Sequence, residues 1–377
     1  MNMKKLLSLV LALIMVLSMT VAFAEDDWSS TEYAAHADYR YTLSGDYTGK
    51  TVILHTNDVH GQIDGYAYIA GLKTYLQGLG AEVILTDSGD YSQGTIYVST
   101  SKGSTAIDMM NIAGYDFATL GNHEFDYGYP QLMENLSNAN FTALCCDVIL
   151  DETGEPILPS SAIWTSESGL KIGFVGVETP ETATKVNPGL INMITFCSFD
   201  DLYTSIQKAV DEVREEADLV VGLCHLGVDN ESKANGYRSI DVLGKVTGID
   251  MVLDGHSHTQ MTAGQNGEMI QSTGTKLANI GVVVIDNESK AIVDNFLLPT
   301  FLGSKVYSFA NIDLETAAAS ALTSAIVDAA YGATFATSEV LLNGDRAPGN
   351  RTEETNLGDL ITDAMVWSVV KEGGIEQ

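Results

Sequence analysis

The stretch TVILHTNDVHG, residues 51–61, joins a short run of strand-forming residues to a loop that carries Asp58 and His60. The run is largely apolar, which is typical of a strand buried on both faces, as in parallel sheets. A helix-like segment, residues 66–79, and a second apolar run, residues 82–86, follow directly. This alternation of strand and helix signals predicts a layered α/β domain.

The alternation continues along the chain. Apolar strand-like runs occupy residues 116–120, 170–177, 218–224 and 250–253, and helical patterns occupy residues 105–113 and 199–217. Residues 281–286 and 291–298 alternate around Asn287-Glu288 as in a β-hairpin. Residues 313–330, with Asp313 as a cap, predict a connecting helix. A Gly/Pro loop and a further helix at 357–370 follow shortly before Gln377, so we expect the start of a truncated second domain.

The N-terminal residues have the pattern of a secretory signal peptide. A short basic start is followed by an apolar run, residues 6–21, and by Ala22-Phe-Ala24, a small-x-small cleavage site. The run is rather short for a stable membrane span, although an uncleaved anchor is the alternative. We therefore expect cleavage near Ala24, a secreted or extracytoplasmic protein without a stable membrane anchor, and a loose segment at residues 25–50.

The composition excludes several classes of partner. The chain has 19 Lys and Arg against 50 Asp and Glu, a formal net charge of −31, so nucleic acid polymers and anionic membranes would be repelled. An anionic small molecule would need strong local positive charge, which bound divalent metals supply. The four cysteines, Cys145, Cys146, Cys197 and Cys224, lack zinc-type spacing and are interpreted as buried apolar residues, with a disulfide possible but not indicated.

Polar side chains concentrate where the predicted strands end. Five of the seven histidines lie at these positions, together with acids and amides. Sites in parallel α/β sheets form outside the carboxyl ends of the strands, so we expect these loops to converge. Each histidine alone could be a surface or capping residue, but their coincidence with five strand ends favours a common site. The residues concerned are Asn57, Asp58, His60, Asp87, Asp90, Asn122, His123, Asp126, His225, Asp254, His256 and His258.

Oxygen and imidazole groups without thiolates suit Mn, Zn, Fe, Co or Ni. The pairs Asp58-x-His60 and His256-x-His258 each offer two ligands from a tight loop, and Asp90 is placed to bridge two cations. Two cations about 3.5–4 Å apart clamp the attacking and leaving oxygens of a displacement at phosphorus and lower the pKa of bound water. The pattern therefore predicts a hydrolytic site.

Five motifs, DVHG, SGD, GNHEFD, CHLG and GHSH, resemble in their order the blocks of the calcineurin-like metallophosphoesterases. Their spacing and the C-terminal NLGDLITDA resemble the secreted 5′-nucleotidase and UDP-sugar hydrolase branch, and the resemblance extends from Thr51 to about Val370. It implies an α-β-β-α sandwich with two divalent metal ions. One ion would be held by Asp58, His60 and His258 and the other by Asn122, His225 and His256, with Asp90 bridging.

The resemblance also implies that His123 points to the substrate phosphate, where it stabilises charge or assists the leaving group. Asp126, three residues later, is spaced to hold the His123 imidazole. The alternative interpretation is that Asp126 is an acid at a helix N-terminus, stabilised by the helix dipole. Glu124 we expect at the surface, and Cys224 we expect to face away from the metals. Arg346 and Arg351 flank the Gly/Pro loop and resemble arginines that reach the substrate phosphate, with a solvated turn as the alternative.

The expected organisation is a signal peptide at 1–24, the segment 25–50, a metallophosphoesterase domain at 51–302, a linker with a helix at 303–343 and the start of a truncated 5′-nucleotidase C-terminal domain at 344–377. The expected activity is nucleotide hydrolysis by attack of metal-activated hydroxide at phosphorus. Alternatives are a 2′,3′-cyclic nucleotide phosphodiesterase, a thiosulfohydrolase relative and a non-catalytic surface protein on the same scaffold.

Overall fold

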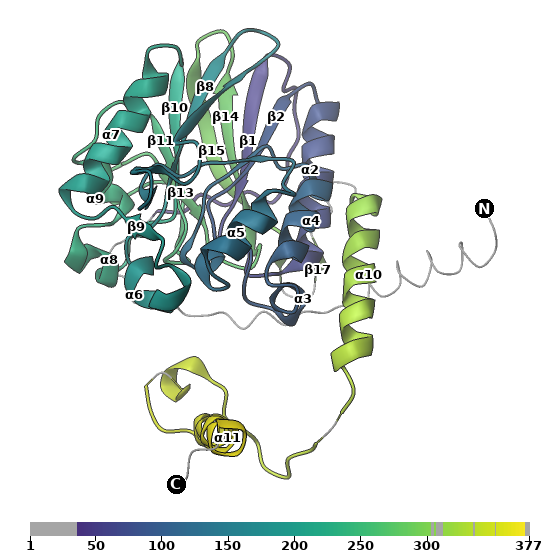
Figure 1. Ribbon diagram of the computed structural model, residues 1–377. Helices are drawn as coiled ribbons and strands as arrows, with labels where there is room; N and C mark the ends of the chain where they lie inside the picture. Colours follow the sequence, from purple (N-terminus) through teal and green to yellow (C-terminus); the bar gives the residue numbers. More distant parts are fainter. Residues whose placement is uncertain (1–35, 303–304, 307–311, 335, 351, 374–377) are drawn as a thin grey trace. The chain divides into compact units, whose positions relative to one another are not determined.

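The computed structural model describes residues 36–302, 305–306, 312–334, 336–350 and 352–373 (Figure 1). The predicted signal peptide and Arg351 lie outside these residues. The chain divides into two compact units, residues 1–327 and 328–377.

The first unit contains two six-stranded sheets. In the first sheet the strand order is β15-β14-β1-β2-β3-β4, with β1 to β4 parallel and β14 and β15 antiparallel. Its strands are β1 (Lys50–Thr56), β2 (Glu82–Asp87), β3 (Phe117–Ala118), β4 (Thr142–Ala143), β14 (Asn279–Asp286) and β15 (Ala291–Pro299).

In the second sheet the order is β12-β13-β11-β10-β8-β7, with β8, β10, β11 and β13 parallel and an antiparallel strand at each edge. Its strands are β7 (Ser161–Thr165), β8 (Lys171–Val177), β10 (Leu219–Cys224), β11 (Met251–Leu253), β12 (Gln260–Met261) and β13 (Ile270–Thr273). Smaller ribbons are formed by β5 (Val148–Leu150), β6 (Glu155–Pro156) and β9 (Ile194–Phe196), and by β16 (Phe301–Leu302) with β17 (Lys305–Val306).

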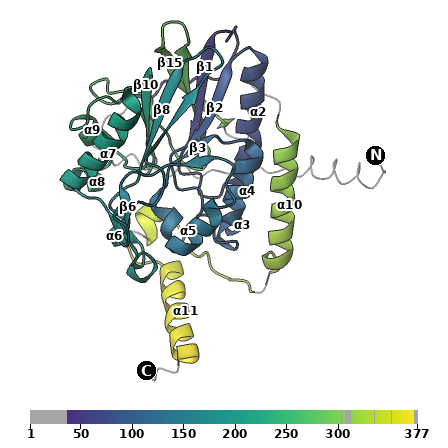
Figure 2. The same cartoon turned by 45° about the horizontal axis from the view of Figure 1, so that its top comes forward.

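Helices cover the outer faces of the two sheets (Figures 1 and 2). The first sheet packs against α2 (Tyr66–Gly78) and α4 (Ser104–Ala113), and the second packs against α7 (Asp200–Arg214). The remaining helices of this unit are η1 (Ile63–Gly65), α3 (Ile96–Ser99), η2 (Asn122–Phe125), α5 (Tyr129–Leu136), α6 (Thr182–Lys185), η3 (Pro188–Leu190), α8 (Asn230–Asn235), α9 (Ser239–Leu243) and most of α10 (Leu314–Tyr331).

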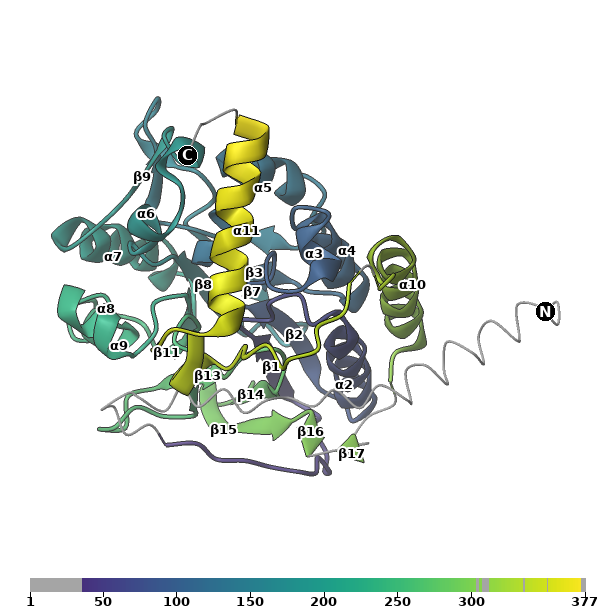
Figure 3. The same cartoon turned by 90° about the horizontal axis from the view of Figure 1, so that it is seen from below.

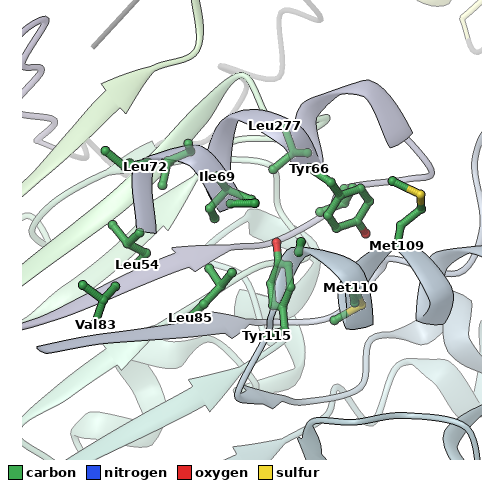
Figure 4. Packing of buried hydrophobic residues seen from close by; sticks show 14 of the residues in the cluster. Leu54, Tyr66, Ile69, Leu72, Val83, Leu85, Met109, Met110, Tyr115 and Leu277 are labelled. Carbon is green, nitrogen blue, oxygen red and sulfur yellow. The ribbon is translucent and has the colours of Figure 1, made fainter. Parts of the chain in front are cut away.

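The alternation of side chains along each strand builds three apolar layers. In β1, Leu54 faces α2, as Figure 4 shows for the cluster around Ile69 and Leu72, whereas Ile53 faces the second sheet. In β10, Val220 packs toward α7 and the next residue, Val221, packs between the sheets. Successive side chains of a strand point to opposite faces, so a strand that is apolar throughout can be covered on both sides. The expected α-β-β-α sandwich is confirmed.

Residues 36–49, which the sequence led us to expect as loose, are attached to the first unit at several points. His36 and Tyr39 form isolated bridges with Ala263 and Leu297. The Arg40 guanidinium donates to both carboxylate oxygens of Asp294, at 2.5 and 2.6 Å. This fork is partly exposed, so its contribution to stability is modest.

Helix α10 begins against α2, beside which Figures 2 and 3 show it. The Asp313 backbone N–H donates to the Ala67 carbonyl, and Ser320 Oγ donates to Asp64 Oδ1 at 2.6 Å. Asp313 Oδ1 accepts the Thr316 N–H at 2.8 Å, which confirms Asp313 as the cap of this helix.

The second unit contains the end of α10, a short helical turn η4 (Arg346–Asn350) and α11 (Asn356–Gly373). Asn356 ties the start of α11 to the preceding loop, since its Oδ1 accepts the Asn343 N–H and its Nδ2 donates to the Leu341 carbonyl, both at 2.8 Å. The helix expected at 357–370 is therefore present. Within the described residues, no helix combines the length and apolar character that crossing a membrane requires.

Candidate metal centre

The loops that follow the parallel strands of both sheets meet at one edge of the sandwich. Ser88 Oγ, after β2, donates to the Leu253 carbonyl of β11 at 2.8 Å. Asn57 Oδ1, after β1, accepts the Thr273 N–H of β13 at 2.9 Å. These buried hydrogen bonds fix the strand ends of one sheet against those of the other, and the predicted ligands lie in the same loops.

Five of the predicted ligands have a left-handed backbone, which is uncommon for residues other than glycine. Left-handed residues make sharp turns, so two side chains separated by one residue can point into the same space. Such conformations cost free energy and cluster at functional sites. They are Asp58 (φ 49°), His60 (φ 47°), Asp90 (φ 63°), His256 (φ 72°) and His258 (φ 53°).

The first group of ligand atoms comes from Asp58, His60 and His258. His258 Nε2 lies 3.1 Å from His60 Nε2 and 3.3 Å from Asp58 Oδ1. His60 Nε2 lies 3.9 Å from the same Asp58 oxygen. The three side chains thus gather around one small volume, and they are the set that the resemblance implies for the first ion.

Asp90 lies between this group and the next. Its Oδ2 is 3.8 Å from His60 Nε2 and 3.2 Å from His225 Nε2. Asp58, Asp90 and His225 form a second group of ligand atoms, and all three residues are buried. A carboxylate that contacts histidines on both sides has the position required of a bridging ligand.

Asn122 and His256 complete the set. Asn122 Oδ1 lies 3.0 Å from His256 Nδ1, and the His256 ring centroid is 5.2 Å from that of His225. The His256 backbone N–H also donates to Asp58 Oδ2 at 3.0 Å. The structure therefore brings all seven predicted ligands to one place.

The donor atoms of this cluster fit divalent cations. The His225 Nδ1–H donates to the Ser88 carbonyl at 2.6 Å and the His60 Nδ1–H donates to the Gln93 carbonyl at 3.1 Å, because a carbonyl oxygen can only accept. In the neutral rings each Nε2 then carries a lone pair, directed at carboxylates and at another imidazole. These nitrogens attract either a proton, which the charge of Asp90 favours on His225, or a divalent cation, so the donor set is one that fits a metal centre.

Two glycines of the motifs are required by close packing around these ligands. A Cβ on Gly121 would lie 2.4 Å from Asp90 Oδ1, and a Cβ on Gly255 would lie 2.7 Å from His225 Nδ1. Any larger residue would displace a ligand. Glycine is therefore required for steric reasons at the first position of GNHEFD and of GHSH.

His123 lies beside the predicted ligands and is more exposed than they are. Its Nδ1 is 2.7 Å from Asp126 Oδ2, and its ring centroid is 5.3 Å from that of His60. The His123 backbone N–H donates to Asp90 Oδ1 at 2.9 Å. The geometry thus places the Asp126 carboxylate where it can orient the His123 imidazole, as the spacing predicted.

Glu124 corrects an expectation. It was expected at the surface, but the side chain is buried and accepts backbone N–H groups from two loops. Its Oε2 accepts from Asp90 and Gly121, both at 2.7 Å, and its Oε1 accepts from Tyr91 and Ser92 at 3.0 and 2.9 Å. Glu124 therefore joins the Asp90 loop to the Asn122 loop.

Sequence reasoning missed Glu181, which follows β8 in the loop VETPE. Its Oε2 lies 3.1 Å from His256 Nε2 and 3.0 Å from Lys185 Nζ. The signal that could have found it is position, because residues 178–181 come directly after an apolar run, as the predicted ligands do. Cys224 packs in the cluster on the α7 side, away from the ligands, and the four cysteines are free thiols.

Burial and charge together set the pKa values in the site. Burial would raise the pKa of the Asp90 carboxyl, but the charge and hydrogen bond of His225 hold it well below its usual range. Burial opposes protonation of His123, yet the hydrogen bond to Asp126 and the charge of Asp90 raise its pKa to about 9. Burial opposes protonation of His225 as well, but the charge of Asp90 likewise raises its pKa above its usual range. The site thus combines anionic carboxylates with two imidazoles, His123 and His225, whose protonated forms are favoured.

Arg351 lies outside the described residues. Arg346 begins η4 in the second unit, and its side chain is likewise outside the described part of the chain.

Comparison with known proteins gives a consistent result. The family described as calcineurin-like phosphoesterase matches residues 51–260. The chain is 28% identical over 365 residues to a snake venom 5′-nucleotidase of Gloydius brevicauda, covering 85% of this chain and 58% of the relative. It is 33% identical over 236 residues to a 5′-nucleotidase of Diplobatis ommata, covering 56% of this chain and 38% of the relative.

Among solved structures, a 5′-nucleotidase precursor of Thermus thermophilus superposes with a TM-score of 0.67 at 24% identity, covering 86% of this chain and 68% of that one. This likeness supports the fold. The chain spans 38–58% of the length of the two curated relatives named above.

Proposed function

The chain belongs to the calcineurin-like phosphoesterase family, and from this premise we propose that it is a secreted hydrolase of nucleotides with two divalent metal ions. The observation that carries the proposal is the convergence of seven ligand-type side chains, Asp90 among them, at one edge of the sandwich. The names of the curated relatives support a nucleotide as substrate. The apolar run and small-x-small site before Glu25 support export.

In this proposal Asp58, His60 and His258 would hold one ion and Asn122, His225 and His256 the other, and Asp90 would contribute to both. When bound, the ions lower the pKa of water and offset charge on the phosphate oxygens. The left-handed turns at Asp58 and His256 and the hydrogen bonds to Ser88 and Gln93 hold the ligand atoms in place before substrate arrives. This preorganisation lowers the cost of binding and of charge development.

His123 contacts the substrate in this proposal. With its pKa raised to about 9, it is largely protonated at neutral pH and can donate to a phosphate oxygen or to the leaving alcohol. Asp126 holds Nδ1–H, so Nε2–H remains for the substrate. Binding an anionic nucleotide to a chain of net charge −31 requires this local positive charge.

The experiment is a hydrolysis assay on residues 25–377 with AMP, UDP-glucose and a nitrophenyl phosphate ester in the presence of Mn. We expect release of phosphate or of the alcohol, loss of activity after chelation and its return on adding Mn. Asp90→Ala should abolish activity, whereas Asp108→Ala, an exposed acid on α4, should not. Turnover that survives both chelation and Asp90→Ala would overturn the mechanism.

A further inference from the structure

The His256 imidazole is held from two sides by groups of different chemistry. Its Nδ1 lies 3.0 Å from Asn122 Oδ1, and its Nε2 lies 3.1 Å from Glu181 Oε2. The side chains of His256 and Glu181 are 8% and 4% exposed, so water competes little for either contact. One ring nitrogen therefore faces a predicted metal ligand and the other faces a carboxylate.

These contacts restrict which nitrogen carries the proton. If Nδ1 held it, Nε2 would direct a lone pair at the Glu181 carboxylate at 3.1 Å, and two acceptors would face each other in a buried place. If Nε2 holds it, Nε2–H donates to Glu181, and Nδ1 and Asn122 Oδ1 are then two acceptors 3.0 Å apart, which a cation held by both would satisfy. A hydrogen bond to a carboxylate is stronger than one to an amide oxygen, so Glu181 draws the proton to Nε2.

We propose that Glu181 is a positioning residue for the metal centre, which keeps the proton of His256 on Nε2 and so reserves Nδ1 for a divalent cation. The proposal rests on the proposed function in taking the cation as the one assigned to Asn122, His225 and His256. Metal-binding histidines depend on an acceptor at their second nitrogen, and changing such a partner typically weakens metal binding about 10- to 100-fold.

Lys185 supports Glu181 in this role. Lys185 is the last residue of α6, four positions after Glu181, and its ammonium lies 3.0 Å from the same Oε2. The other oxygen, Oε1, is buried and accepts no hydrogen bond from the described residues. The Glu181 carboxylate therefore has two polar partners, the Lys185 ammonium and His256 Nε2. It links α6 to the loop after β11.

The first measurement is the tautomer of His256 in the metal-free full chain. Nitrogen-15 labelling of the histidines and NMR at pH 8.5, with assignment from a His256→Asn variant, reports which ring nitrogen bears the proton. We expect Nε2–H in the unmodified protein. Glu181→Gln keeps the shape but can donate as well as accept, so we expect a shift toward Nδ1–H paired with Asn122. Nδ1–H in the unmodified protein, or no change in Glu181→Gln, would overturn the proposal.

The second measurement is Mn affinity by calorimetric titration. We expect Glu181→Gln to weaken one of two sites about 10- to 100-fold and to leave the other unchanged, with a smaller loss in Lys185→Met. Glu215→Gln, the same change at an exposed position after α7, should bind as the unmodified protein does. Equal weakening of both sites together with a lower melting temperature of the metal-free protein would indicate a structural role and contradict the proposal.

The two proposals fail in different ways. A chain that binds Mn and shows the tautomer change but hydrolyses no phosphoester contradicts the proposed function and leaves the role of Glu181 intact. A chain that hydrolyses nucleotides while Glu181→Gln binds Mn normally contradicts the role of Glu181 alone.

Discussion

The two sheets contribute different chemistry to the metal centre. The loops of the first sheet supply mostly carboxylates, and these are satisfied by backbone N–H groups. Glu124 accepts four of them, and Asp90 Oδ1 accepts that of His123. The loops of the second sheet supply histidines, and the ring nitrogens of His225 and His256 that face away from the ligand cluster meet acceptors, the Ser88 carbonyl and the Glu181 carboxylate.

The difference follows from what each side chain needs when it is buried. A buried carboxylate stays ionised only if donors replace the water it has lost, whereas a buried imidazole binds a metal only if an acceptor fixes its proton on the other nitrogen. The loops of the first sheet form the first half of the centre, and those of the second sheet form the second half. Each half also supplies a hydrogen-bond partner to the other. The Ser88 carbonyl accepts from His225, and the His256 backbone N–H donates to Asp58. The two halves are therefore expected to respond differently to substitution.

The largest effect on stability is expected from Glu124→Gln in the first half. The new amide group would face two backbone N–H donors and leave them without an acceptor. A hydrogen bond to a charged group is worth about 1.5–3 kcal/mol, so the free energy of unfolding of the metal-free protein should fall by about 3 kcal/mol or more. Urea unfolding measures this change.

The control for Glu124 is Glu134→Gln, the same substitution at an exposed position on α5, which should change the free energy of unfolding by less than about 0.5 kcal/mol. If Glu124→Gln and Glu134→Gln were equally stable, the hydrogen bonds from the backbone N–H groups to Glu124 would contribute little to the stability of the protein.

A smaller effect, on activity, is expected from Asp126→Asn. His123 is the histidine of the first half that is not a predicted ligand, and the Asp126 carboxylate accepts a hydrogen bond from its Nδ1. His123 is protonated below its pKa of about 9, so removing the Asp126 charge should lower that pKa and move the alkaline limb of the activity profile to lower pH. Activity at pH 8 should fall about 10- to 100-fold.

The measurement for Asp126 is kcat against pH for the unmodified protein and the variant, with Asp108→Asn, an exposed acid, as the control. An alkaline limb that stays in place would mean that Asp126 has no influence on the protonation of His123, and would leave it as an acid at a helix start.

The sequence predicted which side chains come together at the sheet edge, because each motif is local. Asp58 and His60 lie two residues apart after an obvious strand. Asp90 and His256 each lie shortly after another such strand. The rule that parallel strands end at one edge then brings them together without knowledge of side-chain contacts. Periodicity also indicated that β1 and β10 are buried on both faces, although the presence of a second sheet came from the family resemblance.

Glu124 and Glu181 escaped prediction for the same physical reason. In the sequence Glu124 looks like its neighbour Asp126, and its burial depends on backbone N–H groups of residues 90–92, which come from a different loop. Glu181 is likewise defined by His256, 75 positions away. The strand expected at residues 116–120 is only two residues long in β3, and β4 was not expected, because two residues carry no periodic signal.

The smallest effect concerns a buried carboxyl that is not a predicted ligand, in the segment between β4 of the first sheet and β5. Asp147, beside the end of β8, is buried and accepts the Glu178 N–H at 3.0 Å. Burial outweighs its few donors and raises its pKa to about 7, against about 3.9 in an unfolded chain. Its neutral form is favoured by folding, so its contribution is fully present below pH 4 and is lost as pH rises toward 7.

From these values, the Asp147 carboxyl alone should make the metal-free protein about 1.4 kcal/mol more stable at pH 6 than at pH 8. Asp147→Asn should remove this part of the pH dependence, whereas Asp151→Asn, an exposed acid after β5, should retain it. Unfolding free energies of the three proteins at both pH values decide the matter. A pH dependence that is the same in Asp147→Asn would mean that this carboxyl is ionised in the fold despite its burial.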